Sequence, residues 1–197
     1  MGREFELKYR ATLHQQQAIR AAFDGPWKEI SMATAYYDTP TGELSRRKWT
    51  LRRRLEGTRS VCTLKTPDAG FGRREFEVEC GDIHRAIDEL CKLEGSYLLK
   101  QVCAEGLTEV CSARFTRQVL ALTEQDLTVE LSLDRGVLQG GGRELPLGEA
   151  EVELKEGSEE AVLAFGQAPQ TRFGLEPEAK GKFRRASELA QGEGRCW

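Results

Sequence analysis

Two segments of the chain carry the same spacing of acidic and basic side chains, and these residues are the first candidates for chemistry. Glu4-Phe5-Glu6-Leu7-Lys8 lies near the beginning of the sequence, and Glu151-Val152-Glu153-Leu154-Lys155 lies near its end. Alternate side chains of a β-strand point to opposite faces of a sheet, so each segment places two carboxylates and one ammonium on one face. Neighbouring carboxylates repel each other unless a cation or hydrogen bonds compensate their charge. The repeated pattern therefore predicts one site to which both segments contribute.

A short basic stretch offers the opposite charge. It comprises Arg46, Arg47, Lys48, Arg52, Arg53 and Arg54. The formal net charge of the whole chain is −3, which gives no indication of nucleic-acid binding. A local cluster of this kind favours a smaller anion. Strand alternation puts Arg52 and Arg54 on one face and Arg53 on the other, so we expect Arg53 to be a surface residue.

Periodicity and turn residues predict the elements that must position these groups. Strands are expected at residues 3–10, 33–38, 49–56, 60–66, 74–79, 113–122, 126–134 and around 151–155, and helices at 13–23, 82–91, 158–167 and 177–190. Asp82 is a candidate N-cap. Residues 95–110 show no clear pattern. About eight strands joined mostly by short connections indicate an α+β protein with one antiparallel sheet.

The polar faces of the expected strands are segregated by charge, acidic on some strands and basic on others. Any antiparallel sheet with one solvated face also alternates, so a single strand does not decide between arrangements. A closed antiparallel β-barrel with helices packed outside would bury the apolar face and turn the charged face into a tunnel. The collective pattern favours that barrel. Its opposite charges would balance across the interior or around a bound polyanion.

Length and composition indicate one domain in a reducing compartment. The 197 residues are expected to form a single domain over 1–191, followed by a tail at 192–197. The six cysteines show no C-x-x-C pair and no metal-finger spacing, which favours free structural thiols. No signal peptide or long apolar run is present, so we expect a cytoplasmic protein without membrane segments.

The order of motifs along almost the whole chain resembles the CYTH domain, a branch of the triphosphate tunnel metalloenzymes. The matching residues are Glu4-x-Glu6-x-Lys8, Tyr36-Tyr37-Asp38-Thr39-Pro40, Leu51-Arg52-Arg53-Arg54, Thr63-Leu64-Lys65, Arg74-Glu75-Phe76-Glu77, Arg117, Leu133-Asp134-Arg135-Gly136, Glu151-x-Glu153 and Lys182. Within the family the chain is most similar to bacterial inorganic triphosphatases, through Phe173-Gly174-Leu175 and the region 182–191.

The resemblance implies an eight-stranded antiparallel tunnel that binds linear triphosphate with Mg²⁺ or Mn²⁺ and hydrolyses it to diphosphate and phosphate. Hard divalent cations prefer carboxylate oxygens, which suits Glu4, Glu6, Asp134, Glu151 and Glu153 as metal ligands. Guanidinium and ammonium groups match phosphate oxygens, which suits Lys8, Arg52, Arg54, Lys65, Arg117 and Lys182 as substrate-binding residues. The resemblance implies Lys65 and Tyr36 as catalytic residues that position water or assist proton transfer.

Some assignments stay open at this level. Tyr37 competes with Tyr36, Lys180 with Lys182 and Arg114 with Arg117. Lys155 can be a solvated residue. Glu75, Glu77 and Glu79 can bind metal or hold the arginines in place, and the second role is favoured.

The function also has alternatives. A class IV adenylate cyclase, a thiamine triphosphatase or a non-catalytic polyphosphate or nucleotide sensor could use the same tunnel. The expected partner is a small polyphosphate, with no nucleic acid or membrane, and the protein is expected to be a monomer or homodimer.

Overall fold

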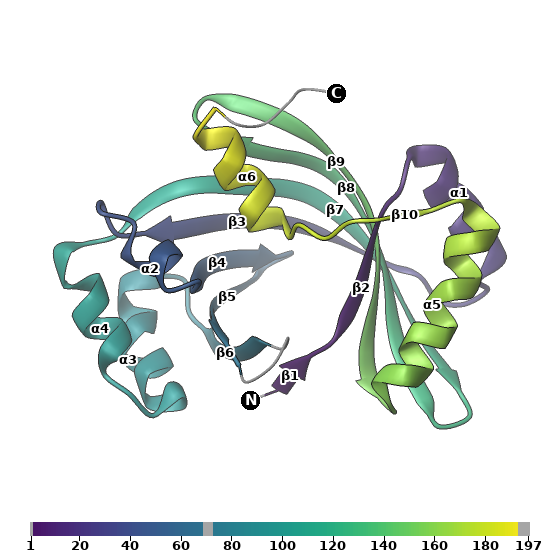
Figure 1. The fold of residues 1–197 in the computed structure, drawn as a ribbon, viewed down its shortest axis with the longest axis horizontal. Coiled ribbons are helices and arrows are strands. Elements are labelled where there is room, and N and C mark those ends of the chain that lie inside the picture. Colours follow the sequence, from purple (N-terminus) through teal and green to yellow (C-terminus); the bar gives the residue numbers. More distant parts are fainter. Residues whose placement is uncertain (1, 69–72, 193–197) are drawn as a thin grey trace.

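The computed structural model of the chain describes residues 2–68 and 73–192, and within this range the side chains of residues 2–4 are not described. Ten antiparallel strands form one sheet in the order β1-β6-β5-β4-β3-β7-β8-β9-β2-β10 (Figure 1). The strands are β1 (Gly2–Glu4), β2 (Glu6–Arg10), β3 (Lys28–Asp38), β4 (Thr50–Glu56), β5 (Arg59–Pro67), β6 (Arg73–Glu79), β7 (Thr108–Glu124), β8 (Leu127–Gly140), β9 (Arg143–Glu156) and β10 (Glu176–Pro177). The predicted α+β class with a single antiparallel sheet is confirmed.

The N-terminal strand is divided at Phe5, where one continuous strand over 3–10 was predicted. Its first part, β1, pairs with β6, and its second part, β2, pairs with β9. The one strand therefore contributes to both ends of the sheet order. This division and the two-residue β10 account for ten strands where eight were predicted.

Six α-helices and one short 3₁₀ helix cover the described part of the sheet. They are α1 (Leu13–Ala22), α2 (Glu43–Arg46), α3 (Ile83–Glu94), α4 (Leu98–Val102), η1 (Cys103–Glu105), α5 (Glu159–Phe173) and α6 (Lys182–Ala190). Asp82 caps α3 as predicted, since its carboxylate accepts from the backbone N–H groups of His84 and Arg85. α5 continues to Phe173, six residues beyond the predicted end. α6 begins at Lys182, where the prediction began near Pro177.

Apolar residues of the strands pack against these helices in three clusters. Leu51, Leu64 and Phe76 of β4, β5 and β6 pack under α3 and α4. β2, β8 and β9 pack under α1 and α5. α6 packs on the cavity side of β3, β7 and β8, where Met32, Tyr36 and Phe115 belong to its cluster and also line the cavity. Figure 1 shows these helix groups on separate parts of the sheet. The predicted phasing agrees with the packing of α1, α3, α4 and α5, because the charged side chains point away from these helices. α6 differs, because it lies on the charged face, where Lys182 contacts Glu149 and Glu151.

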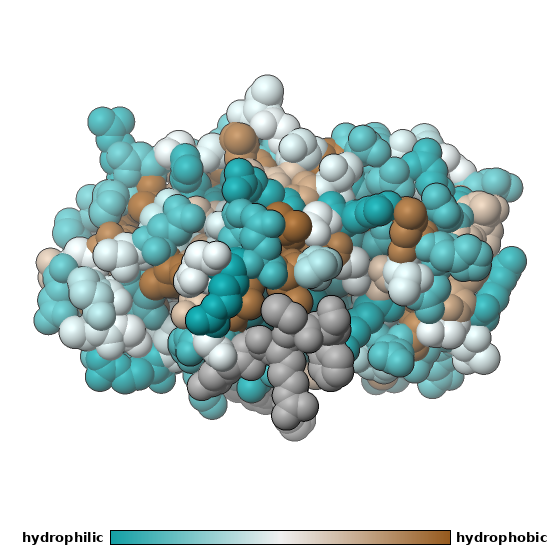
Figure 2. Space-filling model, turned by 90° about the horizontal axis from the view of Figure 1, so that it is seen from above, coloured by the Kyte–Doolittle hydropathy of each residue, from teal (hydrophilic) through white to brown (hydrophobic). Residues whose placement is uncertain are grey.

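Cys62, Cys80, Cys91, Cys103 and Cys111 are free thiols, and Cys196 lies outside the described residues. Burial raises the pKa of Cys62, Cys103 and Cys111 to about 12, which is typical of structural thiols. Among the described residues, no helix has the length and apolarity needed to cross a membrane. The face in Figure 2 is mainly hydrophilic, with hydrophobic residues scattered across it.

Candidate functional site

The charged faces of the strands enclose a cavity of about 720 Å³. Its walls come from alternate residues of the sheet and from the first turn of α6. Ten of the predicted site residues line it: Glu6, Lys8, Tyr36, Arg52, Arg54, Lys65, Arg117, Glu151, Glu153 and Lys182. The structure thus brings together residues that lie up to 176 positions apart between Glu6 and Lys182 in the sequence. The predicted ligand Glu4 has its backbone in β1, but its side chain lies outside the described residues.

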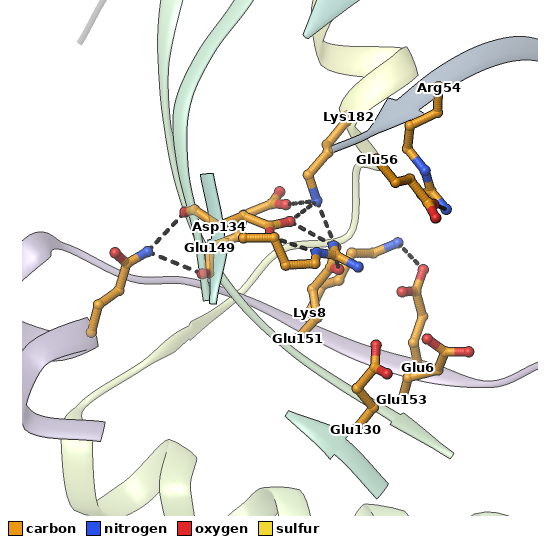
Figure 3. A network of polar contacts seen from close by, with 12 residues as sticks. Glu6, Lys8, Arg54, Glu56, Glu130, Asp134, Glu149, Glu151, Glu153 and Lys182 are labelled. Carbon is orange, nitrogen blue, oxygen red and sulfur yellow. Dashed lines mark hydrogen bonds and ion pairs between the residues drawn. The ribbon is translucent and has the colours of Figure 1, made fainter. Parts of the chain in front are cut away.

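A row of three carboxylates crosses adjacent strands on the acidic wall of this cavity. Glu6 of β2 pairs in register with Glu153 of β9, and Glu153 pairs with Glu130 of β8. All three line the cavity, and Figure 3 shows their side chains in one group. Two ammonium groups flank the row: Lys8 Nζ lies 2.7 Å from Glu6 Oε1, and Lys155 Nζ lies 2.8 Å from Glu153 Oε1. Lys155 therefore lies at the site, although its side chain remains 41% exposed.

A second group of charges lies deeper, next to this row. Arg117 donates two hydrogen bonds of 2.7 Å to the two carboxylate oxygens of Asp134 and a third of 2.5 Å to Glu151. Lys182 Nζ lies 2.8 Å from Asp134 and 2.7 Å from Glu151, and it also contacts Glu149 (Figure 3). Asp134 and Glu149 are completely buried. Arg117 and Lys182 thus join the cavity surface to a buried carboxylate cluster.

The charges of this cluster stabilise each other. Burial opposes ionisation of Glu151, but the nearby Lys182 and Arg117 outweigh it and hold its pKa well below the usual range. Burial likewise disfavours the charged form of Lys182, yet Glu151 and Asp134 raise its pKa. The pKa of Arg117 is raised for the same reason, chiefly by its hydrogen bond to Asp134 against the effect of burial. Glu151, Lys182 and Arg117 are therefore charged near neutral pH.

The basic wall comes from β4 and β5. Arg52 Nη2 lies 3.1 Å from Glu75, and Lys65 Nζ lies 3.2 Å from the same carboxylate. Arg54 Nη2 lies 2.5 Å from Glu56. Arg53 points to the other side, is exposed, and donates to the backbone carbonyl of Gly81, as its predicted surface position requires. The arginine and lysine groups of this wall therefore have carboxylate partners that an incoming anion can replace.

The acidic residues of β6 have two kinds of contact. Glu75 and Glu77 both lie within 4 Å of Arg52, whereas Glu79 pairs with Arg59. These contacts agree with the favoured prediction that Glu75 and Glu77 hold the arginines in place.

The structure distinguishes the paired alternatives by position. Tyr36 lines the cavity, with its ring centroid 5.2 Å from that of Phe183, while Tyr37 packs against the core cluster under α3. Tyr36 lies opposite Arg52 of β4 and Tyr37 opposite Leu51, so strand alternation places the two tyrosines on opposite faces. Burial raises the pKa of Tyr36.

The other two pairs separate in the same way. Lys182 lines the cavity, and Lys180 instead pairs with Glu188. Arg117 lines the cavity, whereas Arg114 is exposed and donates to Gln139.

Two groups of carboxylates can be compared as holders of a divalent metal. Oxygens of Asp134, Glu149 and Glu151 lie within 4.8 Å of one another. Three cations already contact this group, namely Arg117, Lys182 and Arg185. The row of Glu6, Glu130 and Glu153 faces the cavity and supplies the hard oxygen ligands that Mg²⁺ and Mn²⁺ prefer. The donor set of this row therefore fits such a metal.

Sequence reasoning missed three residues of the site. Glu130 lies in the strand predicted at 126–134 but was not named among the ligands. Glu149 precedes the second motif at the same alternation, Glu149-Ala150-Glu151-Val152-Glu153. Both could have been found from that alternation. No sequence pattern indicated Arg185 as a site residue, because its contact with Glu149 depends on how α6 lies on the sheet.

The chain is similar to several known proteins. An inorganic triphosphatase of Haemophilus influenzae is 28% identical over 142 residues, which cover 70% of this chain and 40% of that protein. The chain thus matches less than half the length of this relative. A Hippeastrum protein described as an adenylyl cyclase candidate with a dominant triphosphatase activity has a TM-score of 0.66 at 19% identity, covering 98% of this chain and 97% of its own.

A protein of Pyrococcus horikoshii OT3 has a TM-score of 0.62 at 21% identity, covering 96% of this chain and 99% of its own. These two structural likenesses show the fold. The model of the CYTH domain matches residues 2–187, nearly the whole sequence. On that match, with the predicted motifs gathered in one cavity, the chain belongs to the CYTH domain family.

Proposed function

We propose that this protein is a divalent-metal-dependent triphosphatase that hydrolyses inorganic triphosphate to diphosphate and phosphate. The observation that carries the proposal is one cavity with a carboxylate row on one wall and clustered arginine and lysine groups on another. A polyphosphate with its metal needs both kinds of wall. The triphosphatase of Haemophilus influenzae, to which the chain is similar, supports the same reaction class.

The cavity is proposed to be the interior of a closed tunnel. β1 and β2 follow one another with only Phe5 between them, and they pair with β6 and β9 near opposite ends of the sheet order. One N-terminal strand that contributes to both ends would close eight strands into a barrel. We propose that this tunnel is a single domain over residues 1–191.

The metal is proposed to be Mg²⁺ or Mn²⁺. Glu6 and Glu153, with Glu130, would hold it, and Glu4 and Glu151 remain proposed ligands beside them. When bound, such a cation neutralises charge on phosphate oxygens. Asp134 was also predicted as a ligand. Its bidentate contact with Arg117 and its contact with Lys182 favour a role in holding these two cations.

The chain's own residues would bind and align the substrate. Arg52 and Arg54 can form bidentate hydrogen bonds to phosphate oxygens, with Lys8, Lys65, Arg117 and Lys182 as further cationic groups. Phosphate oxygens would take the place of the carboxylates that these groups contact now.

The reaction itself is a substitution at phosphorus. A water oxygen attacks the terminal phosphorus, the bond to the diphosphate oxygen breaks, and the water loses its proton to solvent or phosphate. Lys65 and Tyr36 would orient that water as hydrogen-bond donors.

One side of the cavity is apolar, which would suit the organic group of a triphosphate. Ile30, Met32, Phe115 and Val119 line one side of the cavity, where a purely inorganic substrate needs no apolar contact. Thiamine triphosphate or ATP could place its organic group there.

The decisive experiment incubates purified protein with inorganic triphosphate, ATP or thiamine triphosphate and follows the products by phosphorus NMR. We expect phosphate and diphosphate from triphosphate at the highest rate, and no reaction in excess chelator. Cyclic nucleotide from ATP would favour the cyclase, and binding without turnover of all three would favour the sensor. Full turnover in excess chelator would contradict the metal dependence.

A further inference from the structure

The buried cluster beneath the cavity contains a cation that the proposed reaction does not use. Arg185 lies one helical turn after Lys182 in α6, with its side chain 11% exposed, and it is absent from the cavity lining. Its guanidinium contacts the completely buried Glu149 and lies 3.9 Å from Glu178. Glu149 is also in contact with Lys182. Arg185 and Lys182 therefore share one buried carboxylate.

The charges of this cluster balance. Asp134, Glu149 and Glu151 contribute three carboxylates, and the cations that contact them are Arg117, Lys182 and Arg185. A buried carboxylate that loses its partner is costly, so it attracts any cation within reach. If Arg185 were removed, Lys182 would be the one cation among the described residues that still contacts Glu149. Lys182 also lines the cavity, together with Phe183 and Arg184 of α6.

The helix itself has an independent attachment to the sheet. A Cβ added to Gly140 of β8 would lie 2.3 Å from the carbonyl oxygen of Ala186, so the backbones of β8 and α6 are in direct contact. Glu178, just before α6, is tied to β2, since its backbone N–H donates to the carbonyl of Lys8 at 2.8 Å and its carboxylate accepts from Arg10 at 2.8 Å. Loss of Arg185 would leave these contacts in place.

We propose that Arg185 is a positioning residue that neutralises Glu149 and thereby leaves the ammonium of Lys182 available to substrate phosphate in the cavity. The inference rests on the proposed function, since it concerns the affinity of the same cavity for triphosphate. Removal of the guanidinium lets Glu149 draw Lys182 away from the anion. Removal of both members of the pair restores the balance of charge, as replacing both partners of a buried ion pair often does.

The test measures binding of imidotriphosphate, an analogue with nitrogen between the phosphorus atoms, by calorimetry with Mg²⁺. We expect Arg185→Met to weaken binding about ten-fold, and Glu149→Gln with Arg185→Met to bind within about two-fold of the unaltered protein. In a Lys182→Met background, Arg185→Met should change the affinity less than about two-fold. Arg172→Met, which removes an exposed arginine of α5, is the matched control.

Each outcome decides between specific statements. If the unaltered protein does not bind the analogue, the proposed function is overturned. If it binds but Arg185→Met has no effect, or the loss persists without Lys182, or the double variant binds more weakly than Arg185→Met, the role of Arg185 is overturned. Should Arg185→Met not fold, the double variant alone decides, because a ten-fold loss there contradicts the proposal.

Discussion

Glu6 and Glu153 lie directly opposite each other on β2 and β9, so the two Glu-x-Glu-x-Lys segments run antiparallel as neighbours. Lys8 lies opposite Glu151 in the same pairing, and each segment's lysine contacts the middle glutamate of its own segment. The motif that occurs twice in the sequence therefore forms one nearly two-fold arrangement. Its centre is a pair of carboxylates.

We predict that this central pair governs metal affinity. Glu6→Gln or Glu153→Gln should each weaken Mn²⁺ binding about ten-fold or more, because each removes one charged oxygen ligand. The double variant should lose less Mn²⁺-binding free energy than the two single variants together, because both residues belong to one site. Calorimetric titration of Mn²⁺ without substrate measures this. Glu144→Gln on an exposed part of β9 serves as control, and unchanged affinity in both single variants would contradict the assignment.

Arg52 and Arg53 offer a matched pair for the basic wall. Arg52→Ala should raise the KM for triphosphate about ten-fold or more, because its guanidinium faces the cavity and is only 13% exposed. Arg53→Ala should change KM by less than about two-fold, because this side chain is exposed on the opposite face. Steady-state kinetics on the two variants compares the faces. Equal changes in KM would contradict the assignment of Arg52 to the cavity face of β4 and of Arg53 to the opposite face.

The raised pKa of Tyr36 predicts a donor role. Its ordinary pKa is about 10, and burial raises it further, so the phenol stays protonated between pH 6 and 9. Tyr36→Phe should therefore lower kcat by a similar factor, about ten, at every pH in this range. A loss that grows as pH rises would instead indicate a deprotonated tyrosine acting as base. Tyr37→Phe, in the core cluster, is the control.

The β7–β8 hairpin supplies a prediction about stability. Gln125 in its two-residue turn has a φ of 51°, a conformation that costs an L-residue about 1–2 kcal/mol and that glycine adopts freely. Gln125→Gly should raise the free energy of unfolding by about 0.5–1 kcal/mol after the entropy cost of glycine. Denaturant unfolding measures the change, with turnover expected to be unaffected. A lower denaturant midpoint for Gln125→Gly would contradict the inference that Gln125 is strained.

Strand faces were predictable because alternation records them directly. Arg52 against Arg53, and Glu151 and Glu153 against Val152 and Leu154, required only a period of two. The cavity lining follows from these faces once the strands are neighbours. Glu130 and Glu149 could also have been predicted as site residues, because the same alternation places them on the charged faces of their strands.

Other features depend on contacts that no local pattern records. The division at Phe5 arises because residues 2–4 and 6–10 pair with different strands, although their alternation is continuous. Arg185 gained its partner only through the placement of α6 against β8. α4, at Leu98–Val102, is too short for a helical period to emerge.

The position of the N-terminal strand has a consequence for synthesis. β2 (Glu6–Arg10) leaves the ribosome long before its partner β9, which spans Arg143–Glu156. Closing a pairing across such a sequence distance costs chain entropy before any contact repays it. During translation the five residues of β2 must therefore wait without this partner, so the cavity cannot be assembled until β9 has been synthesised.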